Sequence, residues 1–390
     1  MENTLHELYE LDVKGVLRLA QNLIRIRTTH PDCNELDLVK YILSLFEGYD
    51  VERRVVHHGD NRASLVLLLK GNDSSGGTAF VGHVDTVNPP YPKSWIHPPY
   101  AADFDEGRIY GNGASNAKGG VAAMIVTALY LLERGIRPQN DVYFCFTADG
   151  DGLGMGAASL CDGGFLEGAR EAIFADPTDS RIGIAQKGVL WLEITARGYC
   201  KHVLEAEKSV DPLRRVLHIG GEIESALCRM PQHALLGKTR TYITSINTGT
   251  QWACILPEAI TATLDIRYSP LVKESEIMEK LDAISQREMA EYPDLSVEVE
   301  KLISRNPIGI ALDAPIVRRI DACFERLGRK PTKMGLGFYS DSSKIVPKLG
   351  IPFVLLGPGN WIFTDRGDES VSLDAILFVS RVYIDYLIGC

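Results

Sequence analysis

Hydrophobic and polar residues recur at helical spacing over Leu11–Ile26, and the pattern ends at the turn Thr28-Thr29-His30-Pro31. A second helix is predicted over Glu35–Phe46, and a third, with small residues in its first turns, over Gly119–Leu132. Short apolar runs bounded by turn residues are typical of buried strands, and they lie at Ser64–Leu69, Thr78–Gly82, Val142–Phe146 and Ala172–Ala175. Strands that alternate with helices predict an α/β core with a largely parallel sheet.

The pattern changes after Asp176. Alternating segments that are typical of strands with one solvated face follow at Val189–Arg197, Thr241–Ser245 and Ala259–Arg267, with helices predicted over Asp211–Leu227 and Lys273–Ala290. From about Pro307 the α/β character returns, with a helix over Ala314–Leu327, a strand over Pro352–Leu356 and a final helix over Asp374–Ile388. We therefore expect a catalytic-type α/β domain over 1–185 and 305–390, and an inserted α+β domain with an antiparallel sheet over 186–304.

Composition adds little beyond the class. The 390 residues are 45% hydrophobic and 24% charged, which is typical of a globular protein with room for two cores. A net charge of -10 argues against a nucleic-acid partner or an anionic membrane. The start Met1-Glu2-Asn3-Thr4 lacks the basic segment of a signal peptide, so we expect a cytoplasmic protein with no membrane association. The eight cysteines form no CxxC pair, which favours reduced core thiols over a zinc knuckle or a disulfide framework.

Polar side chains follow the predicted buried strands. His83 and Asp85 come directly after one of them, and alternation along a strand places residues i and i+2 on the same face. A carboxylate beside an imidazole fixes the tautomer of the ring while its other nitrogen binds a metal ion. Such a pair alone is equally typical of a capped loop.

Further candidates occur in the same order along the chain. Asn116 lies in a glycine-rich turn before a helix, where it either binds a ligand or caps the turn. Asp149 and Asp151 flank Gly150 after the strand Val142–Phe146, Asp176 follows the next strand, and Asp365 lies in an acidic loop near the C-terminus. Each is a common turn residue when taken singly. Together, hard oxygen ligands and one imidazole predict a site for one or two divalent ions.

These motifs identify a family resemblance. Over nearly its whole length the chain resembles the two-zinc peptidases and deacylases, which include acetylornithine deacetylase, succinyl-diaminopimelate desuccinylase, aminoacylase and glutamate carboxypeptidase. The residues that carry the resemblance are Gly82–Val87, Tyr110–Gly120, Thr147–Asp149, Asp176–Thr178, Ile255–Pro257, Asp265–Arg267 and Gly357–Glu369. The resemblance implies an α/β catalytic domain with an inserted lid and dimerisation domain, a small-molecule substrate and a homodimer formed through the lid.

The resemblance also implies roles for single positions. His83 and Asp176 stand at ligand positions of one ion, and Asp85 stands where an Asp orients the histidine. Asp151 stands at a ligand position of the second ion beside the site of catalysis, and Asp365 stands where the family has a C-terminal histidine ligand. In the lid, His202 matches a histidine that reaches the partner's site, and Arg267 matches an arginine that binds the substrate carboxylate.

Some key positions depart from the family pattern. Asn116 stands where the family has an aspartate that bridges the two ions, and Gly150 stands where it has the water-activating glutamate. Asn112 stands in the turn before the bridging position, where the family usually has an arginine close to the substrate. A neutral amide screens two cations less well than a carboxylate, so we expect a weakly bound or single ion, with Mn²⁺ or Mg²⁺ favoured by the oxygen-rich ligands and zinc still open. A missing general base costs ~10²–10⁴-fold in rate. If strand alternation continues past residue 147, Asp149 and Asp151 both point away from the vacant place.

Two hypotheses follow. The first is an enzyme that acts on a C–N bond of a small N-acyl amino acid or peptide-like substrate, by hydrolysis with another base, acyl transfer or condensation in specialised metabolism. The second is a catalytically inactive relative that binds a ligand or a partner protein. Random decay would also have removed His83, His202 and Arg267, so their retention favours the enzyme.

Overall fold

The computed structural model describes residues 9–30, 33–199, 202–204, 210–249, 253–363 and 367–389. The chain divides into two compact units. Unit 1 comprises Met1–Ile184, Ile310–Met334 and Ser340–Cys390, and unit 2 comprises Ala185–Gly309 and Gly335–Tyr339. Unit 2 is thus inserted in the sequence of unit 1 and also includes a short later segment.

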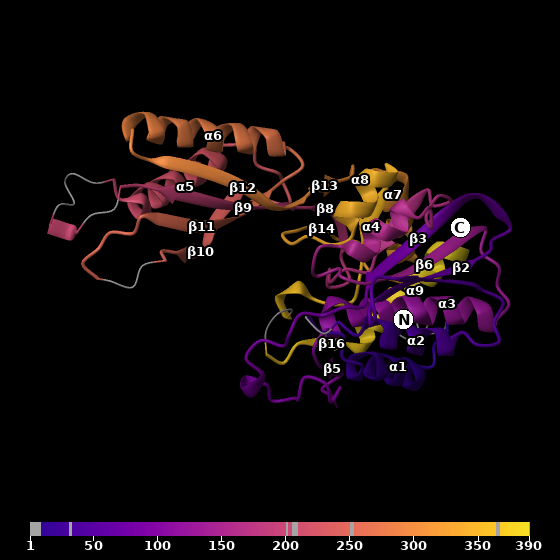
Figure 1. Cartoon of the computed structure of the whole chain (residues 1–390). Helices are drawn as coiled ribbons and strands as arrows, with labels where there is room; N and C mark the ends of the chain where they lie inside the picture. Colours follow the sequence, from indigo (N-terminus) through magenta and orange to yellow (C-terminus); the bar gives the residue numbers. More distant parts are fainter. Residues whose placement is uncertain are drawn as a thin grey trace. The chain divides into compact units, whose positions relative to one another are not determined.

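The main sheet has the strand order β1-β2-β6-β3-β7-β15-β8-β13, with β14 pairing with β8 (Figure 1). Its central strands β6, β3, β7 and β15 are parallel, while β1, β2, β8 and β13 pair antiparallel. The strands are β1 (Glu52–His57), β2 (Ala63–Leu69), β3 (Asp73–His83), β6 (Asn140–Thr147), β7 (Glu171–Phe174), β8 (Ile182–Gln186), β13 (Ile308–Gly309), β14 (Lys333–Leu336) and β15 (Phe353–Leu355). The predicted α/β class is confirmed, with a sheet that is parallel at its centre.

Helices cover both faces of this sheet, with α1, α3 and α9 on one face and α4 and α8 on the other (Figure 1). The helices of unit 1 are α1 (Val13–Arg25), α2 (Glu35–Leu45), α3 (Gly119–Glu133), α4 (Met155–Asp162), α7 (Pro315–Arg326), α8 (Ser342–Leu349) and α9 (Leu373–Ile388). The five that were predicted begin and end within two residues of their expected bounds. The short helices α4 and α8 were not predicted, because glycines surround the first and Pro347 interrupts the second.

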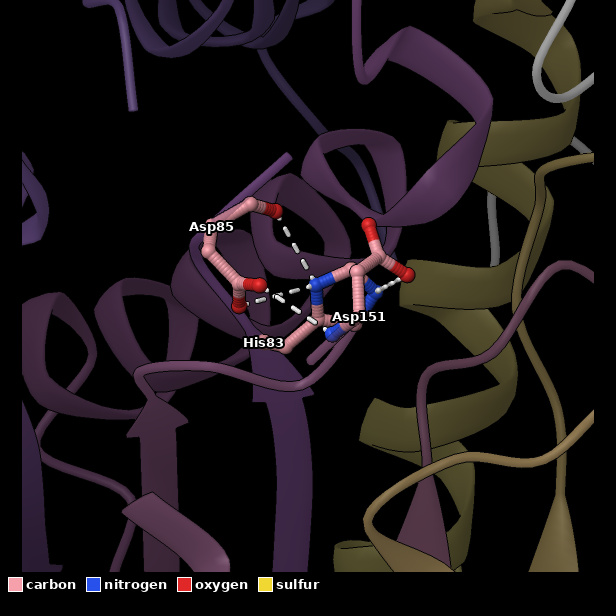
Figure 2. Close-up of side chains that lie close together, drawn as sticks. All are labelled: His83, Asp85 and Asp151. Carbon is pink, nitrogen blue, oxygen red and sulfur yellow. Dashed lines mark hydrogen bonds and ion pairs between the residues drawn. The ribbon is translucent and has the colours of Figure 1, made fainter. Parts of the chain in front are cut away.

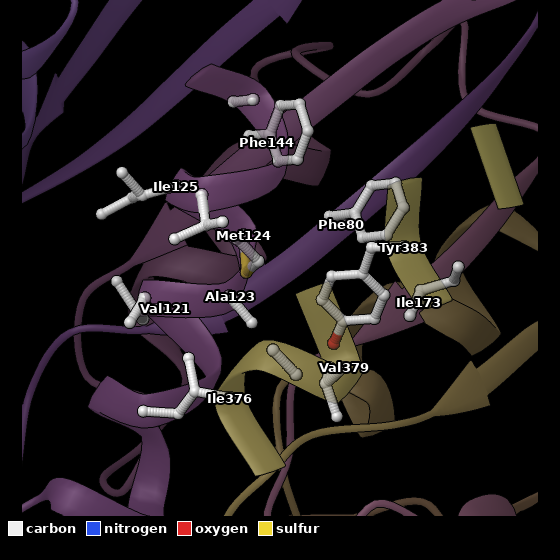
Figure 3. Packing of buried hydrophobic residues seen from close by; sticks show 14 of the residues in the cluster. Phe80, Val121, Ala123, Met124, Ile125, Phe144, Ile173, Ile376, Val379 and Tyr383 are labelled. Atoms are coloured by element: carbon white, nitrogen blue, oxygen red, sulfur yellow. The ribbon is translucent and has the colours of Figure 1, made fainter. Parts of the chain in front are cut away.

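The core of unit 1 forms where α3 and α9 pack on the sheet (Figure 3). Phe80 of β3 stacks on Phe144 of the neighbouring β6, with ring centroids 5.2 Å apart, and meets the edge of Tyr383 of α9 at 4.9 Å. Each such side chain contributes roughly 1.5–3 kcal/mol by leaving water. These contacts hold β3 in place, and β3 ends at His83.

A π-helical turn, η2 (Ala114–Lys118), leads directly into α3. By length and composition alone, the joined stretch Ala114–Glu133 could cross a membrane. However, 83% of its most apolar window is buried inside the fold, and core helices pass the same test.

Unit 2 contains a sheet of order β10-β11-β9-β12 with α5 and α6 on one face (Figure 1). Its elements are β9 (Gly188–Arg197), α5 (Pro212–Cys228), β10 (Arg240–Asn247), β11 (Ala259–Tyr268), α6 (Glu274–Glu291) and β12 (Ser296–Arg305), and all sheet pairs are antiparallel. The predicted strands and helices are confirmed. Strand β12 was missed because charged residues occupy many of its positions and most of it is exposed or half-buried.

A small sheet of order β16-β5-β4 lies in unit 1 and pairs Phe104–Asp105, Arg108–Tyr110 and Ser370–Ser372. Single turns of 3-10 helix occur at η1 (Pro92–Ser94) and η4 (Trp361–Phe363).

Candidate active site

The candidate residues gather where adjacent parallel strands end. Strands β6, β3 and β7 are neighbours, and their carboxyl ends lead into the turn at 148–151, into His83 and into Asp176 respectively. In an open α/β sheet this end of the strands is where ligands bind. The sheet therefore brings together side chains that are almost 100 residues apart in sequence.

His83 lies at the centre of this group and is 5% exposed. Its Nδ1 is 3.0 Å from the backbone oxygen of Asp85 and 3.4 Å from the Asp85 carboxylate (Figure 2). Its Nε2 is 3.0 Å from Oδ1 of Asn116 and 3.8 Å from Oδ1 of Asp151. Burial lowers the pKa of His83, but the charges of Asp151 and Asp85 outweigh it and raise the pKa well above its usual value.

Asp85 is fully buried and is held by several donors. Its carboxylate accepts the backbone N–H groups of Gly150 at 2.7 Å and Asp151 at 3.1 Å, and it lies 3.0 Å from Nε2 of His30. Burial alone would raise the pKa of Asp85, but the contacts with His30 and His83 hold it well below its usual range. A carboxylate this fully engaged fixes His83 and the 150–151 turn and is poorly placed to bind a metal ion.

Asn116 joins His83 to Asp151. Its Oδ1 faces His83, and its Nδ2 donates to Oδ1 of Asp151 at 2.9 Å. Its backbone N–H donates to the buried carboxylate of Glu369 at 3.0 Å, and that carboxylate also accepts the N–H groups of Gly113 and Ser115. Asn116 therefore does not cap α3; Glu369 holds its turn and aims the amide at His83.

Asp149 and Asp151 point to different partners. Asp149 has a positive φ of 63° and accepts from Arg62 at 3.1 Å and from the N–H of Leu153 at 2.9 Å, so its carboxylate serves the turn before α4. Asp151 faces His83 and Asn116. The expectation that both point the same way is wrong, because strand β6 ends at Thr147 and the alternation ends with it.

Gly150 packs directly against His83. A Cβ at this position would lie 2.3 Å from Cβ and 2.6 Å from Cγ of His83, far inside van der Waals contact. The backbone at Gly150 thus packs directly against the histidine, at the position where the family has its glutamate.

Asp176 is 5% exposed, and burial raises its pKa to about 6, although a hydrogen bond from Ser340 and the charge of His83 act in the opposite direction. Among the described residues its Oδ2 has no hydrogen-bond partner. A buried carboxylate oxygen that lacks a protein donor is a suitable ligand for a cation.

Of the remaining predicted residues, Asn112 belongs to unit 1, and Arg267 and His202 belong to unit 2. Asn112 is buried, and its side-chain amide donates to Thr86 and to the backbone oxygen of Val87, so it stabilises the segment after β3. Within unit 2, Arg267 forms a two-pronged ion pair with Asp265 at 2.6 and 2.8 Å. His202 is exposed, and its backbone forms an isolated antiparallel β-bridge with Ile255. Asp365 lies outside the described residues.

His30 was missed as a site residue. It contacts Asp85, and Sγ of Cys33 lies 3.0 Å from its Nδ1. In the sequence His30 follows two threonines in the turn that ends a helix, and nothing in that pattern distinguishes it from an ordinary loop residue.

The described side chains that could hold a divalent ion centre on His83. His83, Asp85 and Asp151 offer ligand atoms within 4.8 Å of one another (Figure 2). Asp85 contacts the Nδ1 side of His83, whereas the Asn116 carbonyl oxygen and Asp151 lie on the Nε2 side. One imidazole with oxygen ligands suits zinc or a harder ion. An amide that already donates to Asp151 is a poor bridge between two cations.

Comparison with known proteins agrees with this fold. The model of the peptidase family M20/M25/M40 matches residues 79–388. The chain belongs to this family of metallopeptidases and related deacylases, and the resemblance found in the sequence is confirmed.

Its relatives include a probable succinyl-diaminopimelate desuccinylase of Staphylococcus aureus, 31% identical over 189 residues, or 48% of this chain and 46% of that protein. The match thus spans about half the length of that relative. A probable succinyl-diaminopimelate desuccinylase of Staphylococcus epidermidis is 22% identical over 96% of this chain and 97% of its own length.

Solved structures share the fold. The aminopeptidase PepT of Bacillus cereus has a TM-score of 0.77 at 20% identity and covers 97% of this chain and 98% of its own. The YXEP protein of Bacillus subtilis, described as a dinuclear metal binding peptidase from the M20 family, has a TM-score of 0.72 at 18% identity, with 97% and 98% covered.

Proposed function

We propose that this chain acts on the C–N amide bond of a small N-acyl amino acid or peptide-like substrate, with one divalent ion. The observation that carries the proposal is His83, which Asp85 holds by its Nδ1 so that its Nε2 faces Asp151 and Asn116. The desuccinylase names of the relatives favour an N-acyl amino acid as substrate.

The ion would be held by His83, Asp151, Asp176 and the carbonyl oxygen of Asn116, and when bound it would polarise the carbonyl of the scissile amide. Asp85 keeps the proton of His83 on Nδ1, which leaves Nε2 as the ligand atom. The carboxylates at 151 and 176 would balance the charge of one divalent ion.

Position 150 offers no general base. Of the two neighbouring carboxylates, Asp149 is committed to Arg62 and the turn before α4, so Asp151 is the group that can accept a proton from an attacking nucleophile. Loss of a positioned base slows water attack by ~10²–10⁴-fold. An amine attacks a carbonyl more readily than water, so acyl transfer suffers less than hydrolysis.

The test is a panel of N-succinyl and N-acetyl amino acids and dipeptides, incubated with protein reconstituted with Mn²⁺ or Zn²⁺, with and without an added amine. Mass spectrometry follows both the free acid and the new amide. We expect slow conversion that is lost in His83→Gln and retained in His218→Gln, a variant of a histidine in unit 2. Absence of conversion for every substrate and acceptor would contradict the proposal.

A second candidate is a binding protein that uses no metal. It is favoured by the closed set of hydrogen bonds in which Asn116 satisfies both His83 and Asp151 without an ion. Calorimetric binding of an N-acyl amino acid to chelator-treated protein, together with an absence of turnover, would select this candidate.

The proposal includes a homodimer formed through unit 2. Strand β10 stands at the end of its sheet order, and its side chains Tyr242 and Ile246 are 55% and 43% exposed. Exposed apolar residues on a strand at the end of a sheet favour pairing with another chain.

A further inference from the structure

We propose that His30 is a positioning residue for the candidate active site, acting through Asp85 on His83, and that Cys33 holds His30 in the required tautomer. The inference rests on the proposed metal site for its metal-binding consequence only. The arrangement of Cys33, His30, Asp85 and His83 is a property of the fold whether or not an ion binds.

The backbone places His30 beside Asp85. Residues 28–30 run next to the segment after β3: the N–H of Thr86 donates to the carbonyl of Thr28 at 3.0 Å, and the N–H of His30 donates to that of Thr86 at 3.1 Å. Thr29 and Thr86 form a parallel bridge. This pairing places the backbone of His30 beside the segment that carries Asp85.

For a neutral His30 ring, the partners of its two nitrogens define one arrangement of protons. Asp85 is an acceptor, so Nε2 of His30, 3.0 Å away, carries a proton. In the neutral ring Nδ1 is then an acceptor, and the thiol of Cys33 at 3.0 Å is its donor. Burial, with Glu35 adding to it, raises the pKa of Cys33 to about 11, so the thiol keeps the proton that this arrangement needs.

Asp85 transmits the effect to His83 and the adjoining turn. Its Oδ2 accepts from both His30 and the N–H of Asp151, and its Oδ1 accepts the N–H of Gly150 and lies 3.4 Å from Nδ1 of His83. Removing His30 leaves Oδ2 with a single backbone donor. The carboxylate is then held only by the two backbone N–H groups and by His83, and both the tautomer of His83 and the position of Asp151 lose a constraint.

Cys33 fits a supporting role better than that of a nucleophile. It is 2% exposed, and a thiol with a raised pKa is a weak nucleophile. Its neighbours include Glu35, which forms an ion pair with Arg62. The carboxylate of Glu35 further disfavours a thiolate at this position.

The experiment compares His30→Leu, which removes the donor to Asp85, with His30→Gln, whose amide N–H can replace it. Chelator-treated protein with ¹⁵N-labelled histidine gives the imidazole resonances of His83, assigned by single-histidine substitutions. Calorimetry with Mn²⁺ and Zn²⁺ gives the affinity for metal. His218→Leu is the matched control, because His218 contacts a buried carboxylate, that of Glu288, at 2.8 Å within unit 2. Thermal melting of every variant establishes that it is folded.

In the wild type we expect His83 to show a protonated Nδ1. His30→Leu shifts the His83 resonances and lowers metal affinity roughly 10–100-fold, as expected for loss of a residue that orients a ligand. His30→Gln restores most of both properties, and His218→Leu changes neither. Cys33→Ala shifts the His30 resonances, while Cys33→Ser, which keeps a hydroxyl donor, shifts them less.

Unchanged His83 resonances in a folded His30→Leu protein would overturn the inference. If the wild-type protein binds neither Mn²⁺ nor Zn²⁺, the proposed metal-dependent function fails, yet the resonances of His83 still decide the positioning role of His30. The two failures are therefore distinguishable.

Discussion

Gly150 and His83 are in such close contact that the lack of a side chain at 150 is a packing requirement in this fold. A Cβ at Gly150 would lie 2.3 Å from His83, and real Cβ atoms essentially never approach so closely. The closure also affects any attempt to restore the family's glutamate, because Gly150→Glu needs the turn to move before its carboxylate can reach the site.

We predict that Gly150→Ala destabilises the protein by about 1–3 kcal/mol, because the added methyl group forces His83 or the turn to shift. Thermal or urea unfolding of the metal-free protein measures the change. Gly76→Ala is the control in the same unit, since its Cβ would meet only Arg170 at 3.7 Å. Equal stability of Gly150→Ala and Gly76→Ala would show that the contact with His83 is relaxed in solution.

Asp176 gives a prediction that depends on pH. Its pKa in the folded protein is raised to about 6 from 3.8, so the folded state binds more protons than the unfolded state between these values, and stability falls as pH rises through them. Keeping Asp176 ionised in the folded protein lowers its stability by at most about 3 kcal/mol, and this loss is fully present above pH 6.

Asp176→Asn should therefore stabilise the metal-free protein by about 1–3 kcal/mol at neutral pH, with the gain disappearing toward pH 4, while metal affinity falls. Chemical unfolding across this pH range tests the sign. A variant that is less stable than the wild type at pH 7 would show that the Asp176 carboxylate is satisfied in the folded state.

At the scale of single residues, most of the cluster was predictable from the sequence, but the contact of His30 with it was not. His83, Asp151 and Asp176 were predictable because polar residues after neighbouring parallel strands converge on one end of a sheet. Asn116 was a candidate because it lies in a glycine-rich turn before a helix. The contact between His30 and Asp85 was not predictable, since it depends on a backbone pairing at Thr86 that leaves no hydrophobic pattern.

Among the elements, the segment between β6 and α4 decides which carboxylate enters the site. Asp149 accepts from the N–H groups of Leu153 and Met155 and from Arg62, and so it ties the start of α4 to the 150–151 turn. Prediction from sequence failed here because the strand pattern gives no sign of where the positive φ at Asp149 ends the alternation.

Asp149→Ala is expected to cost about 1–3 kcal/mol, because it leaves charge-assisted hydrogen bonds unmade. It should also raise hydrogen exchange at the amides of Leu153 and Met155. The control is Asp162→Ala at the other end of α4, where the pair with Lys348 has side chains 65% and 59% exposed. A surface pair of this kind contributes about 0–1 kcal/mol. Equal exchange rates in both variants would contradict the anchoring role.

For the molecule as a whole, the alternation of strands and helices predicted both the α/β class and the presence of an inserted antiparallel unit. Long, strongly periodic segments such as α1 and β11 were predicted nearly to the residue. Strand β12 and the short helices were not predicted, because exposed charges or glycines interrupt the hydrophobic periodicity that would identify them. The order of strands in the sheet rests on long-range pairing that no local pattern records.

The dimer proposal is tested at this scale. We predict that light scattering shows a dimer for the wild type and a monomer for Tyr242→Lys combined with Ile246→Lys, since charges on an edge strand oppose pairing. Leu271→Lys is the control: Leu271 is 53% exposed and lies outside β10. A double variant that remains dimeric would place the interface elsewhere.

We propose, as the central claim, that the site accommodates one divalent ion at most, held around His83, and that it does not support rapid hydrolysis. Elemental analysis of protein purified without chelator, followed by the N-acyl amino acid assay on the same sample, tests it most directly. We predict no more than one ion per chain and hydrolysis that is slow or undetectable. Two tightly bound zinc ions per chain together with fast deacylation would contradict the account.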